Sequence, residues 1–230
     1  MTRRAPKRAP RDIPTDGSCL VTSIRLCTDE PDKATLRVDK INMGRIERAL
    51  LDKHHVKEHT PWTDDLAQEL GPILARSRAL RGAIRLLSTR DRSSAELRRA
   101  LRQRNHDDEA ITAAIERLTE FSMIDDARYA RNRASAIVRT KSAGPRYIQA
   151  KLREKGLAQT HITPAVNEAL EDIDLQDSAN TLATRAAATM SPTLDRETRI
   201  RRISGRLARR GFDHDIVRKA IEHALGNLDD

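Results

Sequence analysis

The most suggestive chemical groups in the sequence are two histidines and a glutamate close together. His55, Glu58 and His59 fit the pattern H-x-x-E-H, which is typical of inverted zinc peptidases. On a helix the two histidines would share a face, and the glutamate could act on a metal-bound water. However, Pro61 ends the expected helix just after the second histidine, and neighbouring lysines disfavour a divalent cation. We therefore expect a solvated helix end and no metal, and keep a zinc enzyme as the third hypothesis.

No other set of residues predicts catalysis. Cys19 and Cys27 are too few for a four-cysteine zinc site. On one strand they would lie about 26 Å apart, so we expect small apolar core residues. The carboxylate pairs Asp107-Asp108 and Asp125-Asp126 lie at expected helix starts, where N-capping explains them. The sequence lacks glycine-rich phosphate loops and G-x-S-x-G elbows, so we expect no enzymatic activity, no catalytic residue and no cofactor.

The charge of the chain indicates a different kind of function. Its 230 residues carry a formal net charge of +9, and 33% of them are charged. This excess of arginine and lysine favours a polyanionic or acidic partner, although a merely solvated basic surface is the alternative. Aromatic residues make up only 2%, which argues against β-sandwiches and against RNA-binding sheets that stack bases.

The N-terminal region predicts a basic tail and then a small β/α element. Residues 1–18 are basic and have no periodicity, and no apolar segment follows as it would in a secretory signal. We expect a disordered tail and a cytoplasmic protein, since no apolar run approaches a membrane span. Within 19–72 we expect two strands, over 19–27 and 34–39. A helix should follow from Gly44 onward, and a shorter helix should end at Gly71-Pro72.

An internal repeat dominates the rest of the sequence. Residues 95–118, 145–170 and 200–225 each contain a basic amphipathic helix, a turn and a second amphipathic helix. Four residues after the last leucine of the first helix, each segment has a residue that tolerates the left-handed conformation. These residues are Asn105, Gly156 and Gly211.

A further helix precedes each pair, so the repeat unit is three helices. Ser93-Ser94-Ala95-Glu96 is a capping box, and Gly144-Pro145 and Ser191-Pro192 would place proline in the first helical turn. A unit this small cannot bury its apolar face alone, so we predict an elongated, curved array of stacked repeats. The predicted repeats span residues 73–124, 125–173 and 174–230.

Cations recur at equivalent steps of the three middle helices. Stacking would align them as a stripe that could contact a long polyanionic or acidic partner, and an ordinary solvated face is the alternative. The candidate contact residues are Arg98, Arg99 and Arg102 in the first repeat, Arg146, Lys151 and Arg153 in the second, and Arg202, Arg206 and Arg210 in the third.

Several segments of the chain resemble the RecX family of bacterial recombination regulators. The resemblance is carried by RGAIRLLSTRDRSSAELRRALRQRN, AIERLTEFSMIDDARYARN and SAGPRYIQAKLREKGL. The run DDARYA and the run from Gly144 to Gly156 are its most specific parts, and it covers about residues 20–225. The sequence departs from the family at Lys40, where a hairpin glycine is common, and at Asn105, which replaces the glycine of the first repeat.

The resemblance implies a non-enzymatic modulator of RecA. Family members are curved three-helix repeat arrays that bind in the groove of the RecA–DNA filament and usually inhibit its ATPase and strand-exchange activities. We therefore expect a monomeric regulator of homologous recombination and the SOS response, with the RecA filament as partner. We also expect weak direct contact with single-stranded or duplex DNA, and no membrane. The alternative is a helical nucleic-acid-binding module that acts on DNA independently of RecA.

Overall fold

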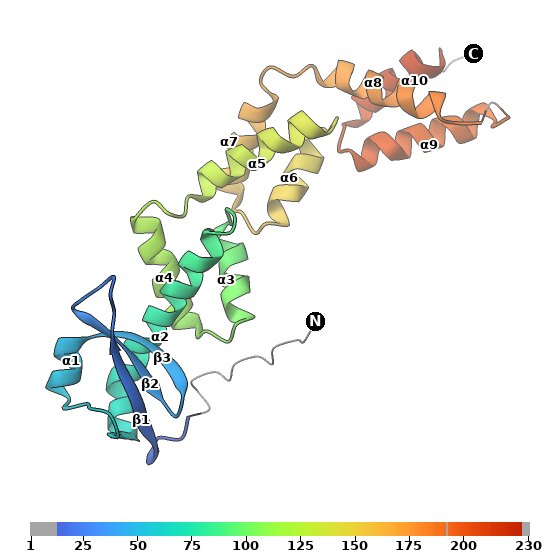
Figure 1. Ribbon diagram of the computed structural model, residues 1–230. Coiled ribbons are helices and arrows are strands. Elements are labelled where there is room, and N and C mark those ends of the chain that lie inside the picture. The colour runs from blue at the N-terminus through green and yellow to red at the C-terminus, as the bar shows by residue number, and fades with distance from the viewer. Residues whose placement is uncertain (1–12, 192, 227–230) are drawn as a thin grey trace. The chain divides into compact units, whose positions relative to one another are not determined.

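The computed structural model describes residues 13–191 and 193–226, which contain ten helices and four strands (Figure 1). This confirms the prediction of a mainly helical chain with a small N-terminal β element. The chain forms two compact units. The first takes in the chain up to Arg92 together with Glu96–Ile124, and the second takes in Ser93–Ala95 and the chain from Asp125 onward. The elongated, curved stacking of the repeats remains a prediction.

An antiparallel four-stranded sheet with the order β3-β2-β1-β4 opens the first unit. Its strands are β1 (Asp16–Leu26), β2 (Lys33–Val38), β3 (Ile41–Glu47) and β4 (Pro61–Thr63). Strand β1 therefore begins inside the predicted tail, of which residues 1–12 lie outside the described part.

The prediction of a helix from Gly44 onward is wrong up to Glu47, because residues 41–47 form β3 and only α1 (Arg48–Lys53) is helical. The cause is the turn at Asp39 and Lys40, which have φ values of 43° and 67°. Positive φ at both residues of a two-residue loop is typical of the tight type I′ hairpin, which returns the chain as a paired strand. Val38 thus lies opposite Ile41, and lysine replaces the usual glycine without opening the hairpin.

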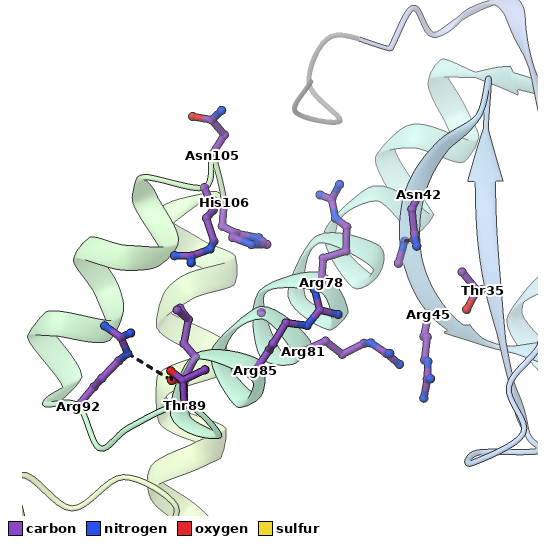
Figure 2. A pocket seen from close by; sticks show the side chains of 14 residues that line it. Thr35, Asn42, Arg45, Arg78, Arg81, Arg85, Thr89, Arg92, Asn105 and His106 are labelled. Atoms are coloured by element: carbon purple, nitrogen blue, oxygen red, sulfur yellow. Dashed lines mark hydrogen bonds between the residues drawn. The ribbon is translucent and has the colours of Figure 1, made fainter. Parts of the chain in front are cut away.

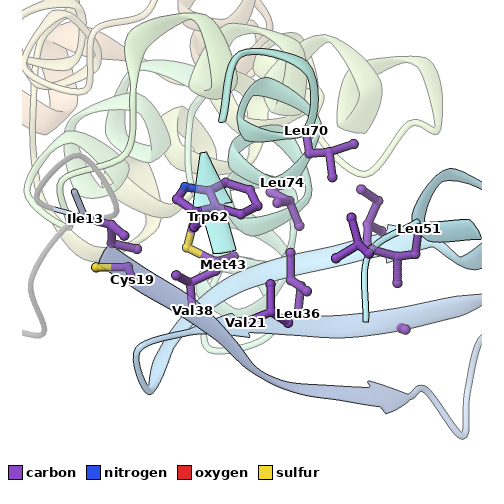
Figure 3. Packing of buried hydrophobic residues seen from close by; sticks show 13 residues of the cluster. Ile13, Cys19, Val21, Leu36, Val38, Met43, Leu51, Trp62, Leu70 and Leu74 are labelled. Atoms are coloured by element: carbon purple, nitrogen blue, oxygen red, sulfur yellow. The ribbon is translucent and has the colours of Figure 1, made fainter. Parts of the chain in front are cut away.

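The sheet packs against helix α2 (Asp64–Leu87), and Figure 3 shows the apolar core between them. Trp62 is only 2% exposed and is the chain's one tryptophan. The predicted helix end at Gly71-Pro72 is wrong, because α2 continues through Pro72. Leu70 and Leu74 are fully buried on either side of the exposed proline. Their burial contributes roughly 1.5–3 kcal/mol each, enough to offset about 3 kcal/mol for an internal proline.

The rest of the first unit is a three-helix bundle. Helix α2 packs with α3 (Ser94–Arg102) and α4 (Asp108–Glu120). Leu97, Leu101 and Ile111 are fully buried in its core, which supports the predicted amphipathic pattern of these helices.

The second unit holds two further three-helix bundles, each with its own apolar core. The first consists of α5 (Asp126–Thr140), α6 (Pro145–Arg153) and α7 (Gln159–Leu170); the second consists of α8 (Leu175–Ala188), α9 (Arg196–Arg209) and α10 (His214–Leu225). No helix in the described residues is both long and apolar enough to cross a membrane.

The helix starts and ends predicted within the repeats are confirmed at most positions. Asn105, Gly156 and Gly211 have φ values of 59°, 74° and 77°, so all three terminate helices in the left-handed conformation as predicted. Pro145 lies in the first turn of α6. The predicted helix start at Ser191-Pro192 is wrong, because α9 begins at Arg196. Its N-cap is Asp195, whose carboxylate accepts the backbone N–H of Thr198. Pro192 itself lies outside the described residues.

The carboxylates of the run DDARYA have two different roles. Asp125 is the N-cap of α5 and accepts the backbone N–H of Arg128, as its position predicted. Asp126 instead accepts hydrogen bonds from the backbone N–H and the hydroxyl of Ser94, at 2.9 and 2.5 Å. Ser93 in turn donates its hydroxyl to the Lys155 carbonyl at 2.6 Å. These bonds join Ser93–Ala95 to the remainder of the second unit.

Candidate filament and nucleic-acid interface

The histidine pattern lies in a loop and not on a helix. Helix α1 ends at Lys53, and His55 and His59 have φ values of 52° and 71°. The Glu58 carboxylate accepts the backbone N–H of Ile24 at 3.2 Å. The expected solvated helix end is therefore wrong in its geometry, since both histidines follow the helix. No cluster of three or more His, Cys, Asp or Glu side chains suited to a metal occurs in the described part of the chain.

The two cysteines are buried and free, at 6% exposure each. Cys19 belongs to the core beneath the sheet. This agrees with the prediction that they act as small apolar core residues.

Of the candidate contact residues, those on α3 belong to the first unit, and two of the three have partners within it. Arg98 is half-buried and donates to the Thr112 hydroxyl at 2.9 Å. Arg102 forms an ion pair with Asp108 at 2.6 Å, which raises the pKa of its guanidinium. Arg99 is exposed and has no ion pair within the described residues, so it is the most available cation of this set.

The candidate residues on α6 are partly neutralised in the same way. Arg146 pairs with Asp213 at 2.9 Å, and Lys151 pairs with Glu154 at 2.9 Å. Arg153 is exposed and donates to the Gln149 side chain at 3.2 Å.

On the third middle helix, Arg202 and Arg206 are exposed and carry no ion pair in the part of the chain described here. Arg210 follows the end of α9 and is half-buried. The three sets therefore differ in how much positive charge they leave for a partner.

The structure adds a cationic cluster around Tyr147 that the sequence analysis missed. Lys141, Lys151 and Arg210 lie 5.6, 5.6 and 6.0 Å from the centre of the tyrosine ring. The Lys141 ammonium donates to the tyrosine hydroxyl at 3.1 Å, and this bond and the nearby charges lower the pKa of Tyr147. Two of the predicted contact residues, Lys151 and Arg210, are thus brought together from α6 and from the end of α9.

A second basic site lies wholly within the first unit. A groove of about 560 Å³ is bounded by the sheet, by one face of α2 and by the turn after α3 (Figure 2). Among the described residues, its lining includes six arginines and no carboxylate. They are Arg45, Arg78, Arg81, Arg85, Arg92 and Arg104. None of them was predicted from the sequence as a contact residue, because they come from three segments that the fold brings together.

The imidazole of His106 in this groove makes the stability of the first unit pH-dependent. Burial lowers its pKa and the charges of Arg78 and Arg104 add to this, although Asp107 opposes them. In the unfolded chain the histidine pKa is about 6.5, and in the folded protein it is lower. As the pH falls, the unfolded state therefore takes up the proton before the folded state does. The free energy of unfolding should therefore fall between about pH 7.5 and about pH 5.5.

Urea unfolding at these two pH values, followed through Trp62 fluorescence, measures the effect. We expect His106→Gln to lose less stability on acidification than the parent. An equal loss in both proteins would show that His106 is not the group responsible.

Comparisons with known proteins agree with this architecture. Family models for the first, second and third three-helix domains of RecX match residues 75–118, 125–166 and 172–221. A protein named "Regulatory protein RecX" from Trichlorobacter lovleyi is 34% identical over 140 residues, which are 61% of this chain and 91% of the relative. Another protein named "Regulatory protein RecX", from Thermobifida fusca, is 34% identical over 159 residues, which are 66% of this chain and 80% of that relative.

Solved structures share the fold. A crystal structure described as regulatory protein RecX superposes with a TM-score of 0.63 at 17% identity, covering 86% of this chain and 96% of that one. The RecX structure from Lactobacillus salivarius gives a TM-score of 0.53 at 23% identity, over 65% of this chain and 96% of that one. With three consecutive domain matches and relatives aligned over most of their own length, the chain belongs to the RecX family of regulatory proteins.

Proposed function

We propose that the protein is a non-enzymatic modulator of RecA that binds the RecA–DNA filament and reduces its ATPase and strand-exchange activities. The observation that carries this proposal is the succession of three three-helix domains whose middle helices each present exposed cations. A filament is a repetitive polyanionic partner, so a repetitive basic array matches it in both charge and periodicity.

The proposed contact face is the set of nine basic residues predicted from the sequence. Within it, Arg99, Arg202 and Arg206 are exposed and carry no ion pair in the described residues, so they should contribute most to a partner. Arg102 and Arg146 would first have to exchange their carboxylate partners, which reduces what each can contribute. We further propose that the protein acts in the cytoplasm as a monomer.

The test is ATP hydrolysis by RecA on single-stranded DNA, with and without the purified chain. We expect RecA turnover to slow as the chain is added, and the chain alone to hydrolyse no ATP. The triple variant Arg99→Gln, Arg202→Gln and Arg206→Gln should inhibit less, because it removes unpaired exposed cations and leaves no carboxylate without its partner. RecA turnover that stays unchanged with excess chain at low salt would reject the proposal.

The second candidate is a helical module that binds DNA without RecA, and the arginine groove of the first unit favours it. Such a module needs only cations and should bind naked DNA as strongly as a filament. It would affect RecA only by competing for the same DNA, so raising the DNA concentration would abolish its effect. A protein that binds the filament should still inhibit RecA when the DNA is present in excess over this protein, provided that RecA covers all of the DNA.

A further inference from the structure

The arginine groove of the first unit is built from three parts of the fold. Strand β3 and the hairpin before it supply Asn42 and Arg45, and α2 supplies the face that carries Arg78, Arg81 and Arg85. The turn after α3 supplies the opposite wall. In Figure 2 the labelled arginines of α2 lie between the sheet residues on one side and Asn105 and His106 on the other.

Most of the positive charge in this groove is not neutralised. Arg45 is the exception, because it pairs with Asp29 at 2.7 Å and Glu30 at 2.5 Å. Arg78, Arg81 and Arg85 have no ion pair among the residues that the structure describes. Three guanidinium groups on one helix face repel one another unless an anion lies between them.

Arg78 is the most constrained of the three. Its Nε is buried and has no hydrogen-bond partner in the structure. Burial lowers the pKa of its guanidinium, and the charge of Asp107 offsets this only in part. A buried donor without a partner is costly, and native proteins rarely keep one without a reason such as a missing ligand.

The sheet is shaped to admit this side chain. Gly44 has a φ of 126°, and a Cβ at that position would lie 3.0 Å from Cγ of Arg78 and 2.6 Å from the Leu74 carbonyl oxygen. Glycine therefore lets α2 approach β3 closely enough for Arg78 to lie against the sheet at the bottom of the groove.

The spacing of the arginines suits a chain of phosphates. From Arg78 to Arg85 the helix rises about 10.5 Å at 1.5 Å per residue. One strand of duplex DNA advances about 3.4 Å along its axis per phosphate, and successive phosphates lie farther apart than this because the backbone winds round the axis. The face is therefore long enough to contact more than one phosphate of a strand. Among the described residues that line the groove, none is Phe, Tyr or Trp, and His106 is the one aromatic ring on which a base could stack. Because six arginines face this single ring, the recognised groups would be mainly backbone phosphates, without base specificity.

We propose that this groove binds the phosphodiester backbone of one nucleic-acid strand, through Arg78, Arg81 and Arg85. The inference deepens the DNA contact in the proposed function and rests on that part of it, but it requires no RecA. It also assigns a binding role to residues outside the nine-residue contact face.

The experiment measures binding of the full chain to a fluorescently labelled oligonucleotide of about 20 thymidines at several salt concentrations. The test variant is Arg81→Gln/Arg85→Gln, which spares the half-buried Arg78 and the apolar core. Each phosphate contact on a single strand contributes about 0.7 to the slope of log affinity against log salt. We expect the double variant to lower the slope by about 1.4 and to weaken binding at low salt roughly tenfold or more.

The matched control is Arg25→Gln/Arg48→Gln, which removes two exposed arginines of the same unit that do not line the groove. It should change the slope much less than the test variant. Equal slopes for the two double variants would overturn the proposal, and circular-dichroism melts would confirm that both remain folded. If the test variant does not fold, the single variant Arg85→Gln, at an exposed position, should lower the slope by about 0.7.

Two further arms separate the possible ligands. An abasic oligonucleotide should bind as well as the thymidine one, and a requirement for bases would overturn backbone recognition. Inorganic tripolyphosphate should compete only weakly; if it binds tightly while the oligonucleotide slope is unchanged in the variant, the groove takes a small anion and the strand proposal is wrong. Because no RecA is present, failure here leaves the proposed inhibition of RecA standing.

Discussion

Binding of the protein to naked DNA should weaken at least about 10³-fold between 50 and 200 mM salt, and binding to a RecA filament should weaken less. A protein that makes roughly 6–10 phosphate contacts loses about 10³–10⁵ in affinity over this range, because each contact releases condensed counterions. The nine-residue contact face alone would give the lower end, and the proposed groove contacts of Arg78, Arg81 and Arg85 would add to it. Arg102, Arg146 and Lys151 already have carboxylate partners, which leaves six of the nine candidate residues without an ion pair to any residue that the structure describes.

The filament differs because part of its contact would be with protein. Protein–protein contacts release few counterions, so they hold the complex when phosphate contacts are screened. Fluorescence anisotropy on the same labelled DNA, bare or coated with RecA, measures both slopes. Equal salt dependence for bare and RecA-coated DNA would mean that the chain contacts only phosphates. The RecA-independent module would then become the better hypothesis.

The repeat could be predicted from the sequence because its signals are local. A leucine that ends an amphipathic helix and a residue that tolerates positive φ four positions later both act within one turn of chain. All three such residues, Asn105, Gly156 and Gly211, have the expected conformation. Core residues that follow from helical periodicity alone, such as Leu97 and Leu101, could be predicted for the same reason.

The errors occur where tertiary packing outweighs a local signal. Pro72 normally ends a helix, but Leu70 and Leu74 are both buried against the sheet and keep α2 continuous. Residues 44–47 have apolar spacing compatible with a helix, yet the tight hairpin at Asp39 and Lys40 pairs them with β2. Neither outcome can be read from a window of a few residues.

The basic sites show the same division. The cations on the middle helices were found because they repeat along the sequence, whereas the groove combines Arg45, Arg78 and Arg104 from segments far apart. The Tyr147 cluster likewise needs Arg210, which the fold brings to α6 from the end of α9. Sites assembled by the fold leave no periodic trace in the sequence.

Replacing Gly156 by valine should strongly destabilise the second unit, and replacing Asn105 by glycine should be nearly harmless. Gly156 has a φ of 74°, where a β-branched residue is strained by roughly 1–3 kcal/mol. A Cβ at this position would also overlap Cβ of Ala95, since the turn lies directly against that residue. Overpacking of this kind costs about 1–3 kcal/mol more, so a loss of roughly 2–6 kcal/mol is expected.

Asn105 has the same conformation, with a φ of 59°, but it is exposed at the surface of the first unit. Asparagine tolerates positive φ, so glycine should leave the melting temperature unchanged or raise it slightly. The comparison explains why the first repeat can depart from glycine. Its turn needs only the backbone conformation, whereas the turn at Gly156 also needs the space that a side chain would fill.

Gly156→Asn separates the two requirements. Asparagine accepts the left-handed conformation but brings a Cβ, so it should still destabilise the second unit if contact with Ala95 is limiting. Thermal melts of Gly156→Val, Gly156→Asn and Asn105→Gly by circular dichroism make the measurement. If Gly156→Val melts with the parent, or Asn105→Gly melts well below it, these two residues do not terminate helices in the way described here. If Gly156→Asn alone matches the parent, backbone conformation and not close packing is what this turn requires.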